Sequence, residues 1–449
     1  MLSFFKKQKM VLGMNSRNLE YIRPYNSGRA IRLADNKLLT KKVLQRAGLP
    51  VSRVFAVIKN QHSLLKFDWQ SLPSSFTLKP NRGLGGKGIL IVYSKKNNRP
   101  SNDGLEQPTW IKADRSQITI PDIQNHILNI LEGTFAINNL PDTAFFEERI
   151  KIIKLLKPYS FRGIPDIRII VYSNVPVMAE LRLPTEESGG RANLHMGGIG
   201  VGIDLGTGIT TSAIQHDHPI DYVPKTRLIL SGIKLPFWRT ILEMAVTAQQ
   251  ASKLKFAGVD IAIDRDQGPI ILELNARPGL AIQIANLAPL KERLERVRGL
   301  KIKSASRGAR LSGELFGGEV EEELEEISGR KIIGIYEKVK IIYGENQEYS
   351  LVAKIDSGAY RSAICQTLID KLNINKESNR AKTVRSSVGQ EERPIVPLKF
   401  ILDNQLIESE VFIADRSQMK FDIIIGRRDL QLFLIDPTKN LILARNHPN

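Results

Sequence analysis

Three oxygen-bearing side chains stand on two apolar segments that can pair as a hairpin. Glu273 and Asn275 lie two residues apart in the run Ile270-Ile-Leu-Glu-Leu-Asn-Ala-Arg-Pro-Gly279, and Asp260 lies on an apolar run just upstream. Residues i and i+2 of a strand point to the same face, so Glu273 and Asn275 project together. Pairing with residues 259–263 would bring Asp260 beside them. Rigidly held oxygen ligands are what Mg²⁺ takes in ATP-using sites, so the pattern indicates nucleotide chemistry.

An edge strand with one solvated face would carry the same residues, and the glycine-rich loop upstream favours the nucleotide interpretation. The loop Lys79-Pro-Asn-Arg-Gly-Leu-Gly-Gly-Lys-Gly88 combines glycines with cations. Glycine lets backbone N–H groups approach phosphate closely, and lysine supplies a point charge. No Gly-Lys-Ser/Thr follows, which excludes a Walker A loop. The flanking segments both read as strands, which excludes a Rossmann fingerprint, although an ordinary hairpin also uses such glycines.

The bulk composition describes an ordinary globular protein. The chain has 449 residues, 42% of them hydrophobic and 25% charged, which is enough for two or three domains. No run approaches the roughly 20 apolar residues of a membrane span, and lysines stand near the N-terminus where a signal peptide would be apolar. Cys365 is the single cysteine, which fits a reducing compartment. We predict a cytoplasmic protein with no membrane span.

The formal net charge of +18 allows several partners. Nucleic acid, a ribosomal partner, anionic lipid and an acidic substrate with ATP would each suit a basic surface. The basic residues lie mostly before residue 300 and are dispersed, and no stretch resembles a zinc finger or an aromatic-basic platform. We therefore do not expect a nucleic-acid partner.

Periodicity and turn residues divide the chain into elements. We expect strands near 49–58, 75–80, 88–93, 144–150, 166–172 and 175–183, helices over 35–48 and 237–254, and an inserted loop over 95–120. Serine, glycine and arginine followed by a glutamate run mark a boundary between about 301 and 330, where a short solvated helix is an alternative to a linker. The expected organisation is an N-terminal extension over 1–34, a first domain over 35–300, a charged linker over 301–330 and a second domain over 331–449.

From about Val11 to Leu290 the sequence resembles the ATP-grasp superfamily, and within it the RimK-like proteins related to α-L-glutamate ligases. The resemblance implies an α+β ATP-grasp fold, in which two α/β subdomains grip ATP. Its motifs, in the order in which they occur, are Asp35-Asn-Lys-Leu-Leu-Thr-Lys, the Lys79–Gly88 loop, Pro165-Asp-Ile-Arg-Ile-Ile-Val, Arg191-Ala-Asn-Leu-His-Met-Gly-Gly and Leu272-Glu-Leu-Asn-Ala-Arg-Pro-Gly.

The resemblance implies roles for individual residues. Lys79 corresponds to the lysine near the α-phosphate and adenine, and the loop residues Gly85, Gly86 and Lys87 to the cover of the β- and γ-phosphates. Glu147 and Glu148 correspond to the hinge around adenine and ribose. The ligands of Mg²⁺, or of Mn²⁺ as an alternative ion, correspond to Asp260, Glu273 and Asn275. The groups around the γ-phosphate and the acyl intermediate correspond to Arg182, Arg191, Asn193 and Arg277.

Other polar residues in these motifs have simpler interpretations. We expect Lys37 and Lys41 to be solvated helix residues and Arg168 to pair on a sheet surface near Asp166. For His195, a structural role and a catalytic contact are equally consistent with the sequence.

The resemblance implies an ADP-forming ligase. A substrate carboxylate attacks the γ-phosphate of ATP to give an acylphosphate, and an amine then displaces phosphate to form an amide; such a reaction needs positioning and charge neutralisation rather than a nucleophilic residue. We expect an amino acid such as glutamate to be added to a peptide or protein acceptor. Only some thirty residues precede Asp35, whereas family members carry a whole N-terminal domain. The acceptor is therefore expected to be bound by other surfaces, by the second domain or by a partner.

The second domain carries a different motif. Alternating apolar residues lead into Asp356-Ser-Gly-Ala359, and a strand Ile423-Ile-Ile-Gly-Arg427 follows downstream. Residues 331 to 445 resemble retropepsin-like aspartic proteases of the RimB type, a family often labelled ATP-dependent zinc proteases, which implies an all-β acid-protease barrel. Asp356 would be catalytic, and Ser357 would support it by a hydrogen bond.

Aspartic proteolysis needs two carboxylates that share a proton, so one such motif requires a homodimer. A barrel that uses Asp356 only in a turn, or that only binds peptide, is the alternative. The chain has six histidines and one cysteine, with His447 the one histidine in this domain, so we predict no zinc site. Two alternatives to the enzyme remain open: a nucleotide-sensing, peptide-binding component of a larger assembly, and a basic protein associated with the ribosome or RNA.

Overall fold

The chain forms two compact units, Met1–Val320 and Glu321–Asn449, called here the N-terminal and the C-terminal unit. The computed structural model describes residues 10–83, 85–96, 108–136, 139–318, 330–344, 347–374, 381–386, 389–416, 418–437 and 439. Among the helices in these ranges, none is long and apolar enough to cross a bilayer.

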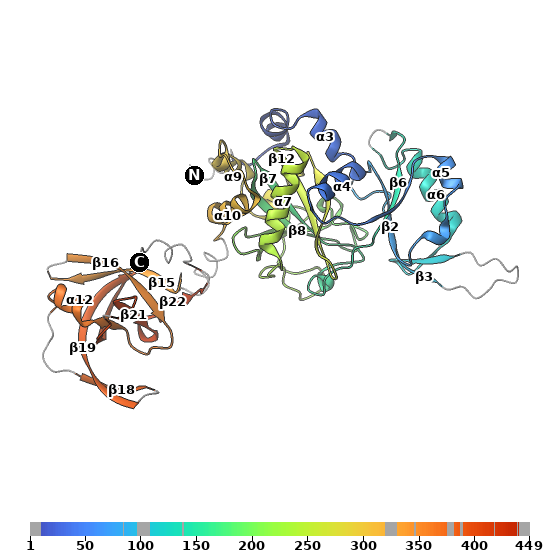
Figure 1. Cartoon of the computed structure of the whole chain (residues 1–449). Coiled ribbons are helices and arrows are strands. Elements are labelled where there is room, and N and C mark those ends of the chain that lie inside the picture. The colour runs from blue at the N-terminus through green and yellow to red at the C-terminus, as the bar shows by residue number, and fades with distance from the viewer. Residues whose placement is uncertain are drawn as a thin grey trace. The chain divides into compact units, whose positions relative to one another are not determined.

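The first sheet of the N-terminal unit has six antiparallel strands in the order β1-β6-β2-β3-β4-β5 (Figure 1). One face of the sheet is apolar and packs against the helix α6, whose Ile123, Ile127 and Ile130 are fully buried at helical spacing. The elements of this part are β1 Val54–Ile58, α5 Gln61–Leu65, η2 Trp69–Ser71, β2 Phe76–Pro80, β3 Leu90–Lys96, β4 Thr109–Lys112, β5 Gln117–Ile118, α6 Ile120–Leu131 and β6 Ala144–Glu147.

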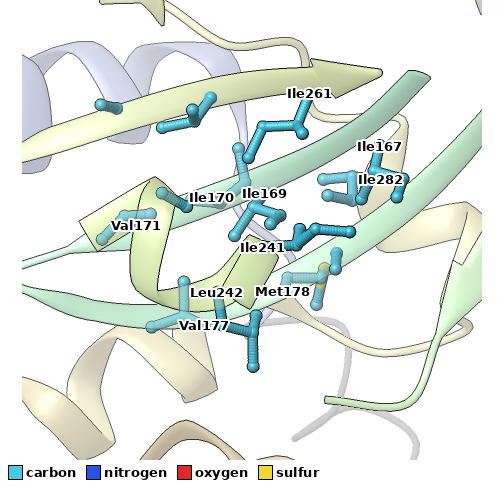
Figure 2. Packing of buried hydrophobic residues seen from close by; sticks show 14 of the residues in the cluster. Ile167, Ile169, Ile170, Val171, Val177, Met178, Ile241, Leu242, Ile261 and Ile282 are labelled. Atoms are coloured by element: carbon cyan, nitrogen blue, oxygen red, sulfur yellow. The ribbon is translucent and has the colours of Figure 1, made fainter. Parts of the chain in front are cut away.

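The second sheet has seven antiparallel strands in the order β11-β10-β9-β8-β7-β12-β13. The helix α7 packs along one of its faces, and Figure 2 shows Ile167, Ile169 and Ile261 of the sheet beside Ile241 of that helix. The elements are η4 Lys157–Tyr159, β7 Asp166–Tyr172, β8 Val175–Leu183, η5 Leu194–Met196, β9 Ile199–Ile203, β10 Thr210–Gln215, β11 His218–Pro219, α7 Trp238–Ser252, β12 Phe256–Asp264, β13 Gly268–Asn275, α8 Ile282–Ala285 and α9 Leu290–Val297.

Alternation along these strands separates apolar from charged residues. Ile167 and Ile169 of β7 face α7, so Asp166 and Arg168 lie on the opposite face of the sheet. The register places Asp260 of β12 opposite Arg168. The sheet therefore carries an apolar core on one face and a charged row on the other.

The first 34 residues, predicted to be an extension, contribute to the core of the N-terminal unit over the range that the structure describes. Leu12, Tyr21 and Ala30 are buried in the same cluster as β7, β8 and α7. Four elements make up this region and the helix that follows it, namely α2 Met14–Ser16, η1 Arg17–Ile22, α3 Gly28–Ala34 and α4 Lys37–Arg46.

The range predicted as a charged linker, 301–330, contains the helix α10, Ala305–Phe316. This helix packs against α7 and β8, and Gly308 lies so close to Asn174 that a Cβ there would meet the Asn174 carbonyl oxygen. Residues 319–329 of the predicted linker lie outside the described residues.

The C-terminal unit contains a closed barrel. Six strands are paired in the circular order β15-β16-β21-β17-β20-β19, because β19 pairs back with β15, and β18 extends β19 as a hairpin. The interior is apolar, with Val339, Phe400 and Ile425 fully buried. The elements are β14 Lys331–Ile333, β15 Tyr336–Tyr343, β16 Gln347–Asp356, β17 Ala363–Cys365, α12 Gln366–Lys371, β18 Ala381–Ser386, β19 Gly389–Leu402, β20 Gln405–Ala414, β21 Ile423–Gly426, η6 Arg427–Asp429 and β22 Phe433–Ile435.

The predicted strands over 166–172 and 175–183 and the predicted helix over 237–254 are confirmed. The predicted loop over 95–120 is wrong at both ends, because β3 continues to Lys96 and β4 and β5 occupy Thr109–Lys112 and Gln117–Ile118. Residues 97–107 of that segment lie outside the described residues. Among the described residues of this segment, the polar Lys96 and Gln117 are exposed positions of strands.

Candidate functional site

The hairpin of β12 and β13 brings the three oxygen-bearing side chains together. Asp260 pairs directly with Glu273, and a β-bulge follows between Asp260 and Ile261. Asn275 Nδ2 lies 3.0 Å from Asp260 Oδ2 and 3.4 Å from Glu273 Oε1. The convergence predicted from alternation is therefore confirmed as geometry.

Two arginines donate hydrogen bonds to the Asp260 carboxylate. Arg168 donates to it through Nε at 2.8 Å and Nη2 at 2.7 Å, and Arg182 donates through Nη2 at 2.8 Å. Burial alone would raise the pKa of Asp260, but the two guanidiniums outweigh it and hold the pKa below its ordinary value. Arg182 also forms a bidentate pair with Asp166 at 2.6 and 2.8 Å. Arg168, predicted to pair near Asp166 on a sheet surface, pairs with Asp260, which shares Arg182 with Asp166, but its side chain is only 13% exposed.

The donor set suits Mg²⁺ in type. Glu273 is the open member, with a side chain 36% exposed, whereas Asp260 is 1% exposed and already bound by guanidiniums. Mg²⁺ in ATP sites keeps one or two carboxylates plus phosphate oxygens, which Glu273 and Asn275 could supply with Asp260 behind them. Among the described residues, no three His, Cys, Asp or Glu side chains form a group that could hold a metal ion by themselves.

A second charged group surrounds Glu147 at the end of β6. Lys79 Nζ of β2 lies 2.6 Å from Glu147 Oε1, and Lys41 Nζ of α4 lies 2.8 Å from Glu147 Oε2. Burial alone would raise the pKa of Glu147, yet Lys79 and Lys41 outweigh it and lower the pKa. Glu148 follows directly and donates its backbone N–H to Arg53 O at 2.8 Å. In this structure, therefore, the Glu147 carboxylate binds lysines.

The helix α4 connects the glycine loop to the hairpin. Lys37 at its first turn donates Nζ to Gly83 O at 2.8 Å and lies 3.8 Å from Glu273 Oε2. Lys41 is 5% exposed and donates to Ser52 O. The prediction that Lys37 and Lys41 are solvated is thus wrong, because a helix exposed on one side can turn its lysines inward to carboxylates.

The glycine loop lies against the segment that follows β8. Gly85 and Gly86 have φ of 61° and 74°, a left-handed conformation that favours glycine. A Cβ at Gly85 would lie 3.5 Å from Asn193 Nδ2, and one at Gly86 would lie 3.5 Å from Arg191 Cδ. Two segments predicted to surround the phosphates therefore meet, and the exposed Lys87 extends from the same loop.

The remaining predicted residues lie at the margins. Arg277, just beyond β13, is exposed and pairs with Asp35 at 3.2 Å. His195 lines a cavity of about 240 Å³ together with His216 and Asp217. The sequence did not predict the contacts made by Asp35, Lys37, Lys41 and Arg168. The family motif Asp35-Asn-Lys-Leu-Leu-Thr-Lys contains the first three of these residues and was the signal that pointed to them.

In the C-terminal unit, Asp356 ends β16, which runs parallel to β21 with Asp356 opposite Gly426. Its Oδ1 accepts hydrogen bonds from the backbone N–H groups of Gly358 at 3.1 Å and Ala359 at 3.3 Å. Lys354 Nζ lies 3.9 Å from Oδ2. The carboxylate is thus positioned by its own turn, with a side chain that is 33% exposed.

Two family models match the chain. One described as sugar-transfer associated ATP-grasp matches residues 16–299, and one described as retropepsin-like aspartic endopeptidase RimB matches residues 361–446, a range that begins after Asp356. No curated protein sequence matches the chain.

Three solved structures are similar to parts of this chain. The ATP-grasp ligase PsnB, complexed with a minimal precursor, is 18% identical, with 61% of this chain and 62% of that chain covered at a TM-score of 0.30. A biotin carboxylase from Campylobacter jejuni is 16% identical, with 66% and 55% covered at a TM-score of 0.39. Lpg0085, a Legionella pneumophila protein of unknown function, is 21% identical, with 24% of this chain and 93% of that chain covered at a TM-score of 0.17.

The chain spans less than two thirds of the length of PsnB and of the biotin carboxylase. The ATP-grasp family model, in contrast, matches more than half of this chain, and its range of 16–299 includes both sheets and every candidate residue of the N-terminal unit. The chain therefore belongs to the sugar-transfer associated ATP-grasp family.

Proposed function

We propose that the N-terminal unit is an ADP-forming carboxylate–amine ligase, close in chemistry to the RimK-like proteins, which adds an amino acid such as glutamate to a peptide or protein. The observation that carries this proposal is the role of α4. Its Lys41 shares Glu147 with Lys79, and its Lys37 joins the glycine loop to Glu273. One helix thus connects the lysine, loop and carboxylate groups that a triphosphate with a metal ion requires.

In the proposed reaction, a substrate carboxylate oxygen attacks the γ-phosphorus, and the bond to the β-phosphate oxygen breaks to release ADP. The amine then attacks the acyl carbon, phosphate leaves, and the amine loses a proton. Lys79 and the loop of Gly85, Gly86 and Lys87 would hold the phosphates. Mg²⁺, held by Glu273 and Asn275 with Asp260, would neutralise phosphate charge.

Arginines would stabilise the charge that develops in the transition state. Arg191 lies against Gly86, Asn193 lies against Gly85, and Arg277 is exposed just beyond the end of β13. A prearranged donor of this kind contributes about 3 kcal/mol to lowering the barrier. Arg182, in contrast, is buried between Asp166 and Asp260, so its proposed contribution is to hold Asp260 in place.

The test is ADP formation by the full chain with ATP, Mg²⁺ and a panel of carboxylate acceptors and amines. The panel should include glutamate with peptides, and also sugar acids, since the matched family is described as sugar-transfer associated. We expect Glu273→Gln to lower turnover by at least a hundredfold, while Glu243→Gln on the outer helix α7 leaves it unchanged. Equal rates for Glu273→Gln and the unsubstituted chain, or no ADP with any acceptor, would contradict the ligase.

We propose further that the C-terminal unit is an aspartic peptidase that acts as a homodimer, with Asp356 contributed by each copy. The supporting observation is the partly exposed carboxylate at the end of β16, a strand of the closed six-stranded barrel, where the turn of Gly358 and Ala359 holds it. Two such carboxylates sharing one proton activate water for attack on a peptide bond.

Peptide cleavage should disappear in Asp356→Asn and persist in Asp403→Asn, an exposed turn substitution in the same unit. Sedimentation should detect a dimer at the concentrations at which cleavage occurs. Cleavage by a species that sediments as a monomer would refute the shared site. The cytoplasmic location stays a prediction.

A further inference from the structure

A buried hydroxyl group of the C-terminal unit is held by a carboxylate. Ser362, which directly precedes β17, is 0% exposed, and its hydroxyl donates a hydrogen bond to Asp429 Oδ2 in η6. A carboxylate only accepts hydrogen bonds, so the proton of the hydroxyl must point to Asp429. The lone pairs of Ser362 Oγ are therefore left for a second partner.

The second partner lies on the strand next to Asp356. Gly426 donates its backbone N–H to Ser362 Oγ at 3.0 Å, and Gly426 is opposite Asp356 in the parallel pairing of β21 with β16. The register of β21 with β17 covers only Ile423 and Ile424. At Gly426 the side chain of Ser362 thus takes the place of a strand carbonyl.

The backbones of these two segments are in direct contact. A Cβ at Gly426 would lie 2.4 Å from Arg361 C and 2.9 Å from Ser362 N, so this position requires glycine. A close-packed contact of this kind has no free space in which to absorb a displacement. A shift of Ser362 is therefore passed on to Gly426.

The same strand end reaches the turn that holds Asp356. Arg427, the residue after Gly426, donates its N–H to Ala359 O at 2.8 Å. Ala359 in turn donates its own N–H to Asp356 Oδ1 at 3.3 Å. Ala359 is thus fixed on one side by Arg427 and fixes the carboxylate of Asp356 on the other.

We propose that Ser362 and Asp429 are positioning residues for Asp356. Asp429 orients the hydroxyl of Ser362, the hydroxyl fixes Gly426, and the neighbouring Arg427 then holds the turn. This inference rests on the proposed peptidase function. Aspartic proteolysis needs two carboxylates placed so that they share one proton, and a misplacement of about 1 Å can cost roughly a hundredfold in rate.

The first test is peptide cleavage by the full chain, with kcat and KM measured separately and kcat expressed per folded molecule. Ser362→Ala and Asp429→Ala should each lower kcat by about tenfold with little change in KM. The double variant should lose no more than either single variant, because both residues act through one path. Asp429→Asn keeps an oxygen acceptor for the hydroxyl and should retain most of kcat. Asp422→Ala removes an exposed carboxylate at the other end of β21 and should leave kcat unchanged.

The outcomes separate a positioning role from a purely structural one. A lower urea midpoint in Ser362→Ala and Asp429→Ala, with kcat per folded molecule unchanged, would overturn the proposal and leave the peptidase intact. If Ser362→Ala does not fold, the comparison of Asp429→Ala with Asp429→Asn decides, since Asp429 is only half-buried. Absence of cleavage by the unsubstituted chain would refute the peptidase function on which the inference rests.

The second test does not depend on cleavage. Amide hydrogen exchange, followed by mass spectrometry, reports the opening of the Gly426 and Arg427 N–H groups. Exchange of these groups should be about tenfold faster in Asp429→Ala than in the unsubstituted chain, and unchanged in Asp422→Ala. Equal exchange in all three proteins would show that Asp429 does not hold this strand end, and the proposal would fail.

Discussion

The Glu147 carboxylate is held between two lysines that come from different elements. Lys79 belongs to β2 and reaches one oxygen at 2.6 Å, while Lys41 belongs to α4 and reaches the other at 2.8 Å. Burial lowers the pKa of Lys41, and Glu147 partly reverses this effect. Because both partners are almost fully buried, the loss of either leaves an uncompensated charge in the interior. Lys41 is thus a positioning residue for the proposed phosphate lysine, Lys79.

Replacing Lys41 by methionine keeps an unbranched side chain that is one heavy atom shorter and removes the charge. We expect Lys41→Met to destabilise the N-terminal unit by about 3 kcal/mol, because Glu147 then keeps only one of its two cations. The midpoint of urea unfolding measures this loss. Lys42→Met is the matched control, since Lys42 is exposed on the same helix and its replacement should change the midpoint little. Equal midpoints for the two variants would show that the buried pair contributes nothing.

The sequence predicted the contacts of those residues whose partners lie close in sequence or at a regular spacing along a strand. Glu273 and Asn275 share a face by alternation alone, and Asp260 joins them through a short hairpin turn. Lys41 gave no such signal, because its partner lies more than one hundred residues away in β6. A lysine on a helix surface is usually solvated, and only the position of β6 shows that this one is buried.

At the level of elements, α6 shows how local sequence sets a helix start. Thr119 accepts a hydrogen bond from the N–H of Asp122 at 3.4 Å, and Asp122 accepts from the N–H and hydroxyl of Thr119 at 2.9 and 2.6 Å. Pro121 lacks a backbone N–H, which costs nothing here because N–H groups in the first turn of a helix have no partner within the helix. Such a capping box holds the helix that covers the first sheet. The hydrogen bonds from Thr119 hold the pKa of Asp122 below its ordinary value.

This capping box predicts a pH dependence. A carboxyl group with a lowered folded-state pKa contributes stability above its ordinary pKa, and this contribution disappears as the pH falls through the folded-state value. Asp122→Asn should therefore be less stable than the unsubstituted chain at pH 7, and the difference should shrink in acid. Urea unfolding between pH 7 and pH 3 measures it. The exposed substitution Asp221→Asn should show no comparable trend; a parallel trend in both variants would indicate net charge as the cause.

At the level of the whole molecule, the chain contains two units with separate cores. The N-terminal unit buries the residues around β7, β8 and α7 and those beneath α6, and the C-terminal unit buries the barrel interior. Among the described residues, each of these buried clusters contains residues of one unit alone. Each unit has its own candidate chemistry, the nucleotide site in one and Asp356 in the other.

The separate cores predict that the units fold independently. A chain that ends at Val320 and one that begins at Glu321 should each be soluble and should unfold cooperatively, because each contains whole buried clusters. Calorimetry of the two halves and of the full chain measures this. The sum of the two transitions should reproduce the unfolding enthalpy of the full chain. A half that lacks a cooperative transition would mean that its core is completed by the other half.

Sequence patterns were sufficient for the strands β7 and β8, the helix α7 and the convergence of Asp260, Glu273 and Asn275, because alternation and helical spacing are local properties of the chain. Folding in three dimensions was needed to show that Arg168 and Arg182 hold Asp260 and that Lys41 reaches Glu147. Those contacts depend on the register between strands far apart in sequence. Register is set by the packing of the whole sheet and cannot be inferred from the residues near each contact.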